Sequence, residues 1–172
     1  TGVTIMKMDV GLDTGPMFAK KSIRLNPDDT AGSVLTALST LGADLLNETL
    51  PDIISGKLTA EPQPAEGATY APMLKKEDGL LDFTHSAIEL EHRVRAMNPW
   101  PGAWFEWNGN PLKVARASVV SGEKSLASGS RFTVEGRPAV MSADGALVLE
   151  EVQPAGKKIM PGKSFLAGAR GW

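Results

Sequence analysis

Residues 8–16 read Met8-Asp9-Val10-Gly11-Leu12-Asp13-Thr14-Gly15-Pro16. This stretch lies between two β-rich runs, residues 3–8 and residues 17–24. The pattern predicts two strands with a glycine-rich loop between them. Such a loop presents Asp13 at the carboxyl end of a strand, where open α/β sheets build their active sites.

Loop chemistry alone leaves two interpretations of Asp13. A carboxylate flanked by glycines can orient and stabilise a catalytic imidazolium, as the acid of a hydrolase triad does. It can also close an Asx-turn, in which the side chain bonds to its own backbone.

The segment after the second strand has a helical pattern. Residues 26–30 predict a turn followed by a helix N-cap. Leucines recur at helical spacing over residues 35–46, and residues 50–54 continue the pattern as far as Gly56. With Gly42 as a possible break, we expect two helices here. These elements are too few to close a sheet alone, so residues 1–60 are expected to be the end of a larger α/β domain.

Residues 61–78 have the composition of a linker, with proline at positions 62, 64 and 72. Proline favours a stiff, extended connector. Residues 79–172 are therefore expected to form a second domain.

That second domain has a helix followed by short strands. Ser86 and Glu89 fit a capping box, and Asn98-Pro99 ends the predicted helix. Asn108-Gly109 and Asp144-Gly145 are hairpin signals. One leading helix with several short strands predicts a small barrel of the oligonucleotide-binding (OB) type. The apolar stripe of the helix is Ala87, Leu90, Val94 and Met97, and the strand-like runs are residues 104–107, 112–120, 131–134, 139–141 and 146–152.

Composition excludes several classes of protein. The net charge is −2 and there is no cysteine, which rules out disulfides and thiolate chemistry and fits a cytoplasmic protein. No apolar run is long enough to cross a membrane. Beyond Glu151 the only charged residues are basic. This tail is either one rim of an anion-binding face or a solubilising surface.

Aromatic and histidine side chains are weaker candidates. Trp100, Trp104, Trp107 and Tyr70 can stack on bases. Core packing is the expectation, with Trp100 wedged between the helix and the barrel. His85 and His92 are not at metal-ligand spacing, so we expect an exposed or structural role for both.

Three blocks of this sequence resemble the methionyl-tRNA formyltransferases, a branch of the folate-dependent formyltransferases. Their order and spacing hold over essentially the whole chain. The resemblance implies an α/β remnant of a Rossmann-like formyltransferase domain, followed by an OB-like barrel domain. The blocks are residues 1–5 with 9–16, residues 98–104 with 112–114, and residues 153–158 with Met160.

The resemblance also implies an activity. It is the transfer of a formyl group from 10-formyltetrahydrofolate to the α-amine of methionine on initiator tRNA, without a metal. Asp13 would be catalytic, and Asp9, Val10, Gly11 and Leu12 would line the folate pocket. The implied partners are initiator Met-tRNA and the folate cosubstrate, with no membrane and no DNA. Side chains available to hold tRNA, each otherwise a solvated surface charge, are Lys75, Lys76, Arg95, Lys113, Arg116, Lys157, Lys158 and Arg170.

One departure from the family pattern is large. The aspartate of that family acts with an upstream Asn-x-His pair, and no Asn in this sequence has a His two positions later. We therefore expect a C-terminal part of such an enzyme that is inactive alone. Two alternatives stay open: a non-catalytic RNA-binding module, and a formyltransferase acting on a nucleotide-sugar amine.

Overall fold

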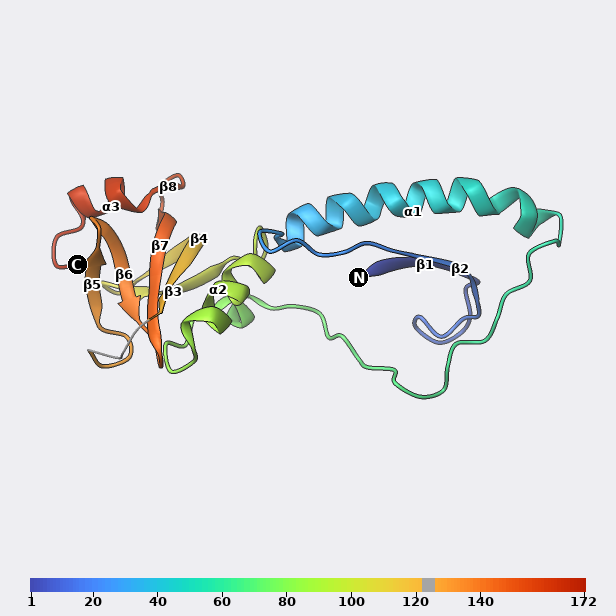
Figure 1. The fold of residues 1–172 in the computed structure, drawn as a ribbon, viewed down its shortest axis with the longest axis horizontal. Helices are drawn as coiled ribbons and strands as arrows, with labels where there is room; N and C mark the ends of the chain where they lie inside the picture. Colours follow the sequence, from blue (N-terminus) through green and yellow to red (C-terminus); the bar gives the residue numbers. More distant parts are fainter. Residues whose placement is uncertain (122–125) are drawn as a thin grey trace. The chain divides into compact units, whose positions relative to one another are not determined.

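A computed structural model describes residues 1–121 and 126–172. In it the chain divides into two units, Thr1–Pro72 and Met73–Trp172. Both units are mixed α/β, and the described residues form three α-helices and two sheets. Each unit is described by itself below (Figure 1).

The first unit is a β-hairpin covered by a long helix. Strands β1 (Gly2–Met6) and β2 (Met17–Ser22) pair antiparallel, so the prediction of two strands around the glycine-rich loop is confirmed. Helix α1 (Ala31–Ile54) lies along the hairpin (Figure 1). The predicted N-cap is also confirmed, because the Thr30 hydroxyl accepts a hydrogen bond from the Ser33 backbone N–H.

The prediction of two helices in this unit is wrong, because α1 continues through Gly42 without a break. A Cβ atom at Gly42 would lie 3.3 Å from Cγ1 of Val3 on β1. The glycine therefore allows the helix to approach the hairpin closely, and the contact compensates for the low helix propensity of glycine.

The start of the expected linker is attached to the hairpin. The backbone of Glu61 exchanges two hydrogen bonds with Met17, at 2.7 and 2.8 Å. A short 3-10 helix, η1 (Lys76–Gly79), then opens the second unit.

The second unit is built on one antiparallel sheet. Its strand order is β3-β4-β7-β6-β5, with β8 added on β7. All five predicted strand runs are confirmed. Among the described residues, β3 and β5 are the two edge strands of the sheet and do not pair with each other, so the sheet does not close into a barrel. The strands are β3 (Ala103–Trp107), β4 (Asn110–Ser121), β5 (Arg131–Val134), β6 (Arg137–Met141), β7 (Gly145–Pro154) and β8 (Met160–Pro161).

Helix α2 (Ala87–Ala96) supplies one side of the core, as predicted. Leu90 and Val94 are fully buried, in the same cluster as Leu147 and Leu149 of β7. The predicted capping box is present. The Ser86 hydroxyl accepts a hydrogen bond from the Glu89 backbone N–H, and the Glu89 carboxylate accepts one from the Ser86 backbone N–H.

A second helix in this unit, α3 (Gly162–Gly168), was not predicted. It is short, begins after a proline and contains glycine at both ends, so its local propensity is low. Its Phe165 ring packs edge-on against Trp107 and Trp172, with ring centroids 5.0 and 5.5 Å apart. Tertiary packing, rather than local sequence, stabilises this helix.

Candidate functional site

The loop between β1 and β2 holds the predicted catalytic and folate-binding residues. A backbone hydrogen bond from Lys7 to Pro16 closes its base, at 2.9 Å. Asp9 forms the local turn, because its carboxylate accepts from the Val10 N–H at 2.7 Å. Asp13 has a left-handed backbone with φ of 53°. Its side chain is exposed, and no described residue donates a hydrogen bond to it.

The loop is fixed from outside by a residue that sequence reasoning missed. The Gln63 side-chain amide donates to the carbonyl oxygens of Asp13 and Gly15, at 2.7 and 2.8 Å. Gln63 lies between two prolines of the expected linker. The sequence signal that could have indicated this role is an amide side chain between two prolines, because proline stiffens the segment that carries the amide.

The remaining loop residues are exposed. Gly11 and the side chains of Val10 and Leu12 face solvent, the two side chains with 104% and 81% of their surface accessible. The four residues predicted to line a folate pocket therefore lie together with Asp13 on one loop.

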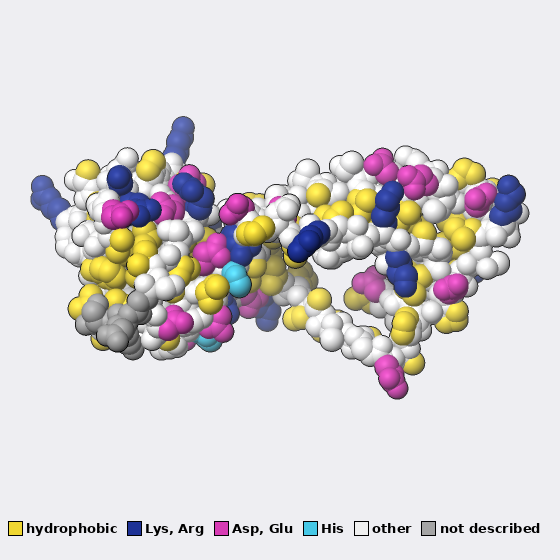
Figure 2. Space-filling model, viewed as in Figure 1, with side chains coloured by type: hydrophobic (Ala, Val, Ile, Leu, Met, Phe, Trp, Pro, Cys, Tyr) yellow, Lys and Arg dark blue, Asp and Glu magenta, His cyan; other side chains and the backbone are white. Residues whose placement is uncertain are grey.

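The predicted tRNA-binding residues are distributed over several elements of the second unit. Lys75 and Lys76 lie at η1, Lys157 and Lys158 in the turn after β7, and Arg170 beyond α3. On the face shown in Figure 2, basic side chains alternate with acidic ones. This face does not present one continuous basic stripe.

Two of the predicted residues have carboxylate partners. Arg95 is paired with Glu91 on the same helix at 2.7 Å, and both side chains are mostly buried. Arg116 of β4 lies 3.5 Å from Glu151 of β7, and this pair is more exposed. Pairing leaves less positive charge for a phosphate at these positions than at an unpaired lysine.

Two others line a common groove. Lys76 and Lys113 border a hollow of about 470 Å³ on the outer face of the β3–β4 hairpin. The indoles of Trp100 and Trp104 form part of its wall. The groove thus combines ammonium groups with aromatic rings.

The prediction that the aromatic residues belong to the core holds for Trp107, which packs against the core cluster. It is wrong for Trp100 and Tyr70, which are 55% and 82% exposed. At the proline corner the buried position is taken by Pro101, so the Trp100 indole faces outward. Trp104 is half-buried, and its Nε1 donates to the Lys76 carbonyl at 3.1 Å.

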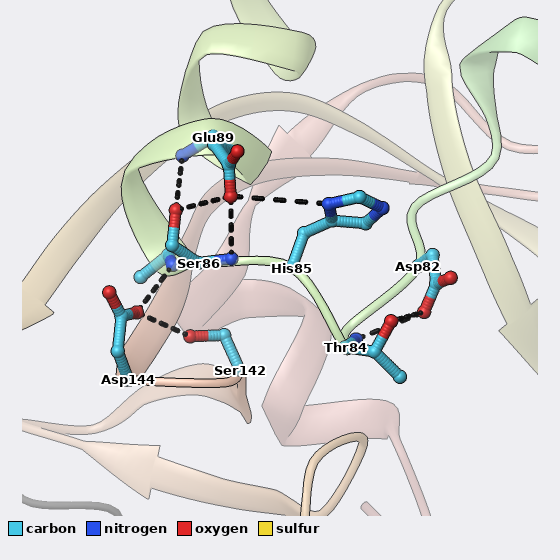
Figure 3. A network of polar contacts seen from close by, with 8 residues as sticks. Asp82, Thr84, His85, Ser86, Glu89, Ser142 and Asp144 are labelled. Carbon is cyan, nitrogen blue, oxygen red and sulfur yellow. Dashed lines mark hydrogen bonds and ion pairs between the residues drawn. The ribbon is translucent and has the colours of Figure 1, made fainter.

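His85 takes part in a polar network that supports helix α2 (Figure 3). Its Nδ1 lies 4.0 Å from Glu89 Oε2 at the helix start. Asp144, from the turn before β7, accepts from the Ala87 N–H at 2.9 Å. Because these carboxylates cap backbone N–H groups, the network is a helix cap anchored to the sheet.

Hydrogen bonding lowers two pKa values in this network. The Ser86 hydroxyl, and then the Ser86 backbone N–H, hold the pKa of Glu89 below its usual value. The Thr84 backbone N–H, and then the Thr84 hydroxyl, do the same for the pKa of Asp82. Both carboxylates are therefore stabilised in the charged form that caps and turns require.

His92 is exposed on α2. Across residues 1–121 and 126–172, no group of three or more His, Asp or Glu side chains is placed to hold a metal ion. No helix in the described part of the chain combines the length and the apolar character that membrane crossing requires.

Two family models match the chain. The model described as "Formyl transferase, C-terminal domain" matches residues 73–170. This chain belongs to the formyl transferase family. The model described as "Formyl transferase" matches residues 1–50, the segment that carries the Asp13 loop.

Two curated relatives of this formyl transferase carry the same name. The chain is 45% identical over 98% of its length to "Methionyl-tRNA formyltransferase" of Myxococcus xanthus, and covers 54% of that protein. It is 42% identical over 99% of its length to the protein of the same name from Roseiflexus castenholzii, and covers 55% of it. The chain thus spans about half the length of these relatives.

Solved structures share the fold of this formyl transferase. HypX from Aquifex aeolicus in complex with tetrahydrofolic acid matches 96% of the chain and 29% of that protein, with a TM-score of 0.70 at 18% identity. A methionyl-tRNA formyltransferase from Clostridium thermocellum matches 90% of the chain and 56% of that protein, with a TM-score of 0.56 at 18% identity.

Proposed function

We propose that this chain is the tRNA-holding half and the closing catalytic segment of a methionyl-tRNA formyltransferase. The observation that carries the proposal is the order of the two family matches, together with relatives of that name at 45% and 42% identity over nearly the whole chain. The reaction is transfer of a formyl group from 10-formyltetrahydrofolate to the α-amine of methionine on initiator tRNA, in the cytoplasm.

The domain assignment follows from this proposal. Residues 1–60 end a Rossmann-like catalytic domain, residues 61–78 form the linker, and residues 79–172 form an OB-like domain. The length of β4 and its two register shifts support the last assignment, because such irregularities bend a strand towards barrel curvature.

In the proposed reaction the methionine amine attacks the formyl carbon, and a tetrahedral oxyanion forms. Its collapse breaks the bond between that carbon and N10 of the folate, the amine loses a proton, and N10 gains one as tetrahydrofolate leaves. Stabilising that charge is usually the largest catalytic contribution. Asp13 orients an imidazole and favours its charged form, while the backbone of residues 9–12 lines the pterin pocket. Support comes from the Asp13 carboxylate, which is exposed and carries no described hydrogen bond that would have to be broken.

The test joins the chain to the part of the Myxococcus xanthus relative that the match leaves uncovered. Formylation of initiator Met-tRNA by the extended chain is expected, and Asp13→Asn should lower kcat at least about 100-fold. Asp44→Asn is the matched control, because it removes an exposed carboxylate from α1 of the same unit, outside the proposed site; its rate should stay within a few-fold. An unchanged rate in Asp13→Asn contradicts the proposal. Asp13-dependent formylation by the 172-residue chain alone contradicts its predicted inactivity.

A nucleotide-sugar amine is the second candidate acceptor. The N-formyltransferase from Helicobacter canadensis, solved with folinic acid and dTDP-3-aminofucose, matches the chain with a TM-score of 0.67 at 17% identity. Competition between that sugar and Met-tRNA in the same assay separates the two acceptors. A non-catalytic RNA-binding module predicts tRNA binding and no Asp13-dependent transfer.

A further inference from the structure

We propose that the groove beside Trp100 takes one unpaired nucleotide of an RNA strand, with its base on the Trp100 indole and its phosphate at Lys113. The inference rests on the proposed function and deepens it, because it names a subsite for the RNA. The groove lies wholly within the second unit, between η1, the proline corner and the β3–β4 hairpin.

The first argument is the exposed indole. Trp100 has 55% of its surface accessible, although a large aromatic side chain is normally well buried. It lies between Pro99 and Pro101, which fix the backbone and limit the entropy that an occupant would have to remove. An aromatic ring held in this way is a stacking platform for a base, and stacking needs no particular sequence.

The second argument is the alternation of side-chain directions along the paired strands β3 and β4. Ala103 and Phe105 point to the core, which leaves Trp104 on the outer face, directly opposite Lys113 of β4. The Lys113 side chain runs past Gly102, where a Cβ atom would lie 3.7 Å from Nζ. That distance is ordinary van der Waals contact, so the Lys113 side chain lies against the proline corner, where Gly102 adopts a φ of 83°.

The third argument is charge. Among the described residues, neither Lys76 nor Lys113 is in a salt bridge, whereas Arg95 and Arg116 are. Two ammonium groups next to an indole match the phosphate and base of a nucleotide.

The groove also limits the size of its occupant. Glu77 and Glu106 line it together with the two lysines. The two carboxylates balance the two ammonium groups, so a continuous run of phosphates gains little attraction, whereas a single phosphate placed at the lysines is attracted by the nearer charges. The volume of about 470 Å³ is of the size that one small ligand occupies.

The experiment measures anisotropy of a fluorescein-labelled hexauridylate against the purified 172-residue chain at several salt concentrations. Trp100→Leu should weaken binding about 5- to 100-fold, and Trp100→Phe should stay close to the wild type because it keeps a stacking ring. Tyr70→Leu is the matched control, since it removes an exposed aromatic residue from the other unit. A hexamer with abasic ribose in place of every base should bind as weakly as the Trp100→Leu complex.

The phosphate contact has its own measurement. Lys113→Gln should reduce the slope of log affinity against log salt by about 0.7, the value for one phosphate contact on a single strand. Lys163→Gln, which removes the same charge from α3, should leave the slope unchanged. An unchanged slope in Lys113→Gln would show that Lys113 makes no phosphate contact.

Three results overturn the proposal: no binding of the hexamer by the wild type, affinity of Trp100→Leu within twofold of the wild type, and displacement of the hexamer by equimolar dTDP. The last would assign the groove to a free nucleotide. If the groove fails while Asp13-dependent formylation persists in the extended chain, the subsite alone is wrong. Loss of that dependence contradicts the proposed function, whatever the groove binds.

Discussion

Gln63 holds the backbone of Asp13. Its side-chain Nε2 donates to the Asp13 carbonyl at 2.7 Å and, through its second proton, to the Gly15 carbonyl at 2.8 Å. The two residues are separated by 50 positions in the sequence. A linker residue thus fixes the loop that carries the proposed catalytic carboxylate.

Replacing Gln63 by Met keeps the length of the side chain and removes both hydrogen bonds. Opening of the loop should become easier by about 1 to 2 kcal/mol. Hydrogen exchange should show this as faster exchange of the Lys7 and Met17 amides, which bond to Pro16 and Glu61. Gln153→Met is the control, because Gln153 donates to the Lys157 carbonyl in the other unit. Equal exchange in wild type and Gln63→Met would show that the amide is not a restraint.

Gly15 should tolerate no side chain. A Cβ atom there would overlap the Lys7 carbonyl oxygen, which is backbone and cannot rotate away. Gly15→Ala should therefore destabilise the first unit by about 2 kcal/mol or more, measured by urea unfolding. Gly168→Ala has open space around its Cβ position and should change stability by less than about 0.5 kcal/mol. Wild-type stability of Gly15→Ala would contradict the close approach of the two backbone segments.

The start of helix α2 should be sensitive to acid. The pKa of Glu89 is lower in the folded chain than in the unfolded chain, where it is near 4.5. The Glu89 carboxylate therefore stabilises the fold at pH values above the unfolded pKa, and this stabilisation is lost as the pH falls through the folded pKa. Thermal unfolding from pH 7 to pH 3 should show a shallower loss of stability in Glu89→Gln than in the wild type. His85 and Arg93 lower this pKa further but weakly. Parallel pH profiles would exclude Glu89 as the titrating cap.

Two neighbouring carboxylates on β7 should differ in importance. Glu150 accepts from Ser118 at 2.6 Å and Arg137 at 2.7 Å, and is 16% exposed. Glu150→Gln should cost about 1 to 2 kcal/mol, because it leaves the Arg137 charge less compensated in a half-buried site. Glu151 meets Arg116 at 3.5 Å and is 42% exposed, so Glu151→Gln should cost less than about 0.5 kcal/mol. Equal losses in urea unfolding would contradict the distinction.

The sequence by itself located most of the local elements of this protein, but not the short helix α3 or the continuity of α1. Short strand-like runs separated by glycine, proline and asparagine turns located β3 to β7, and the Asn108-Gly109 pair indicated the turn between β3 and β4, where the φ values are 50° and 73°. The capping box located the start of α2. Each of these signals acts within a few residues, so it can be recognised without knowing what packs against it.

Tertiary structure decided what those elements touch. Gly42 continues a helix instead of breaking it, because Val3 packs against it from another element. Trp100 faces solvent while its neighbour Pro101 is buried. The Gln63 side chain bonds to Asp13, which is 50 positions earlier in the sequence. Contacts between distant segments depend on how the whole chain packs, and local propensity carries no information about them.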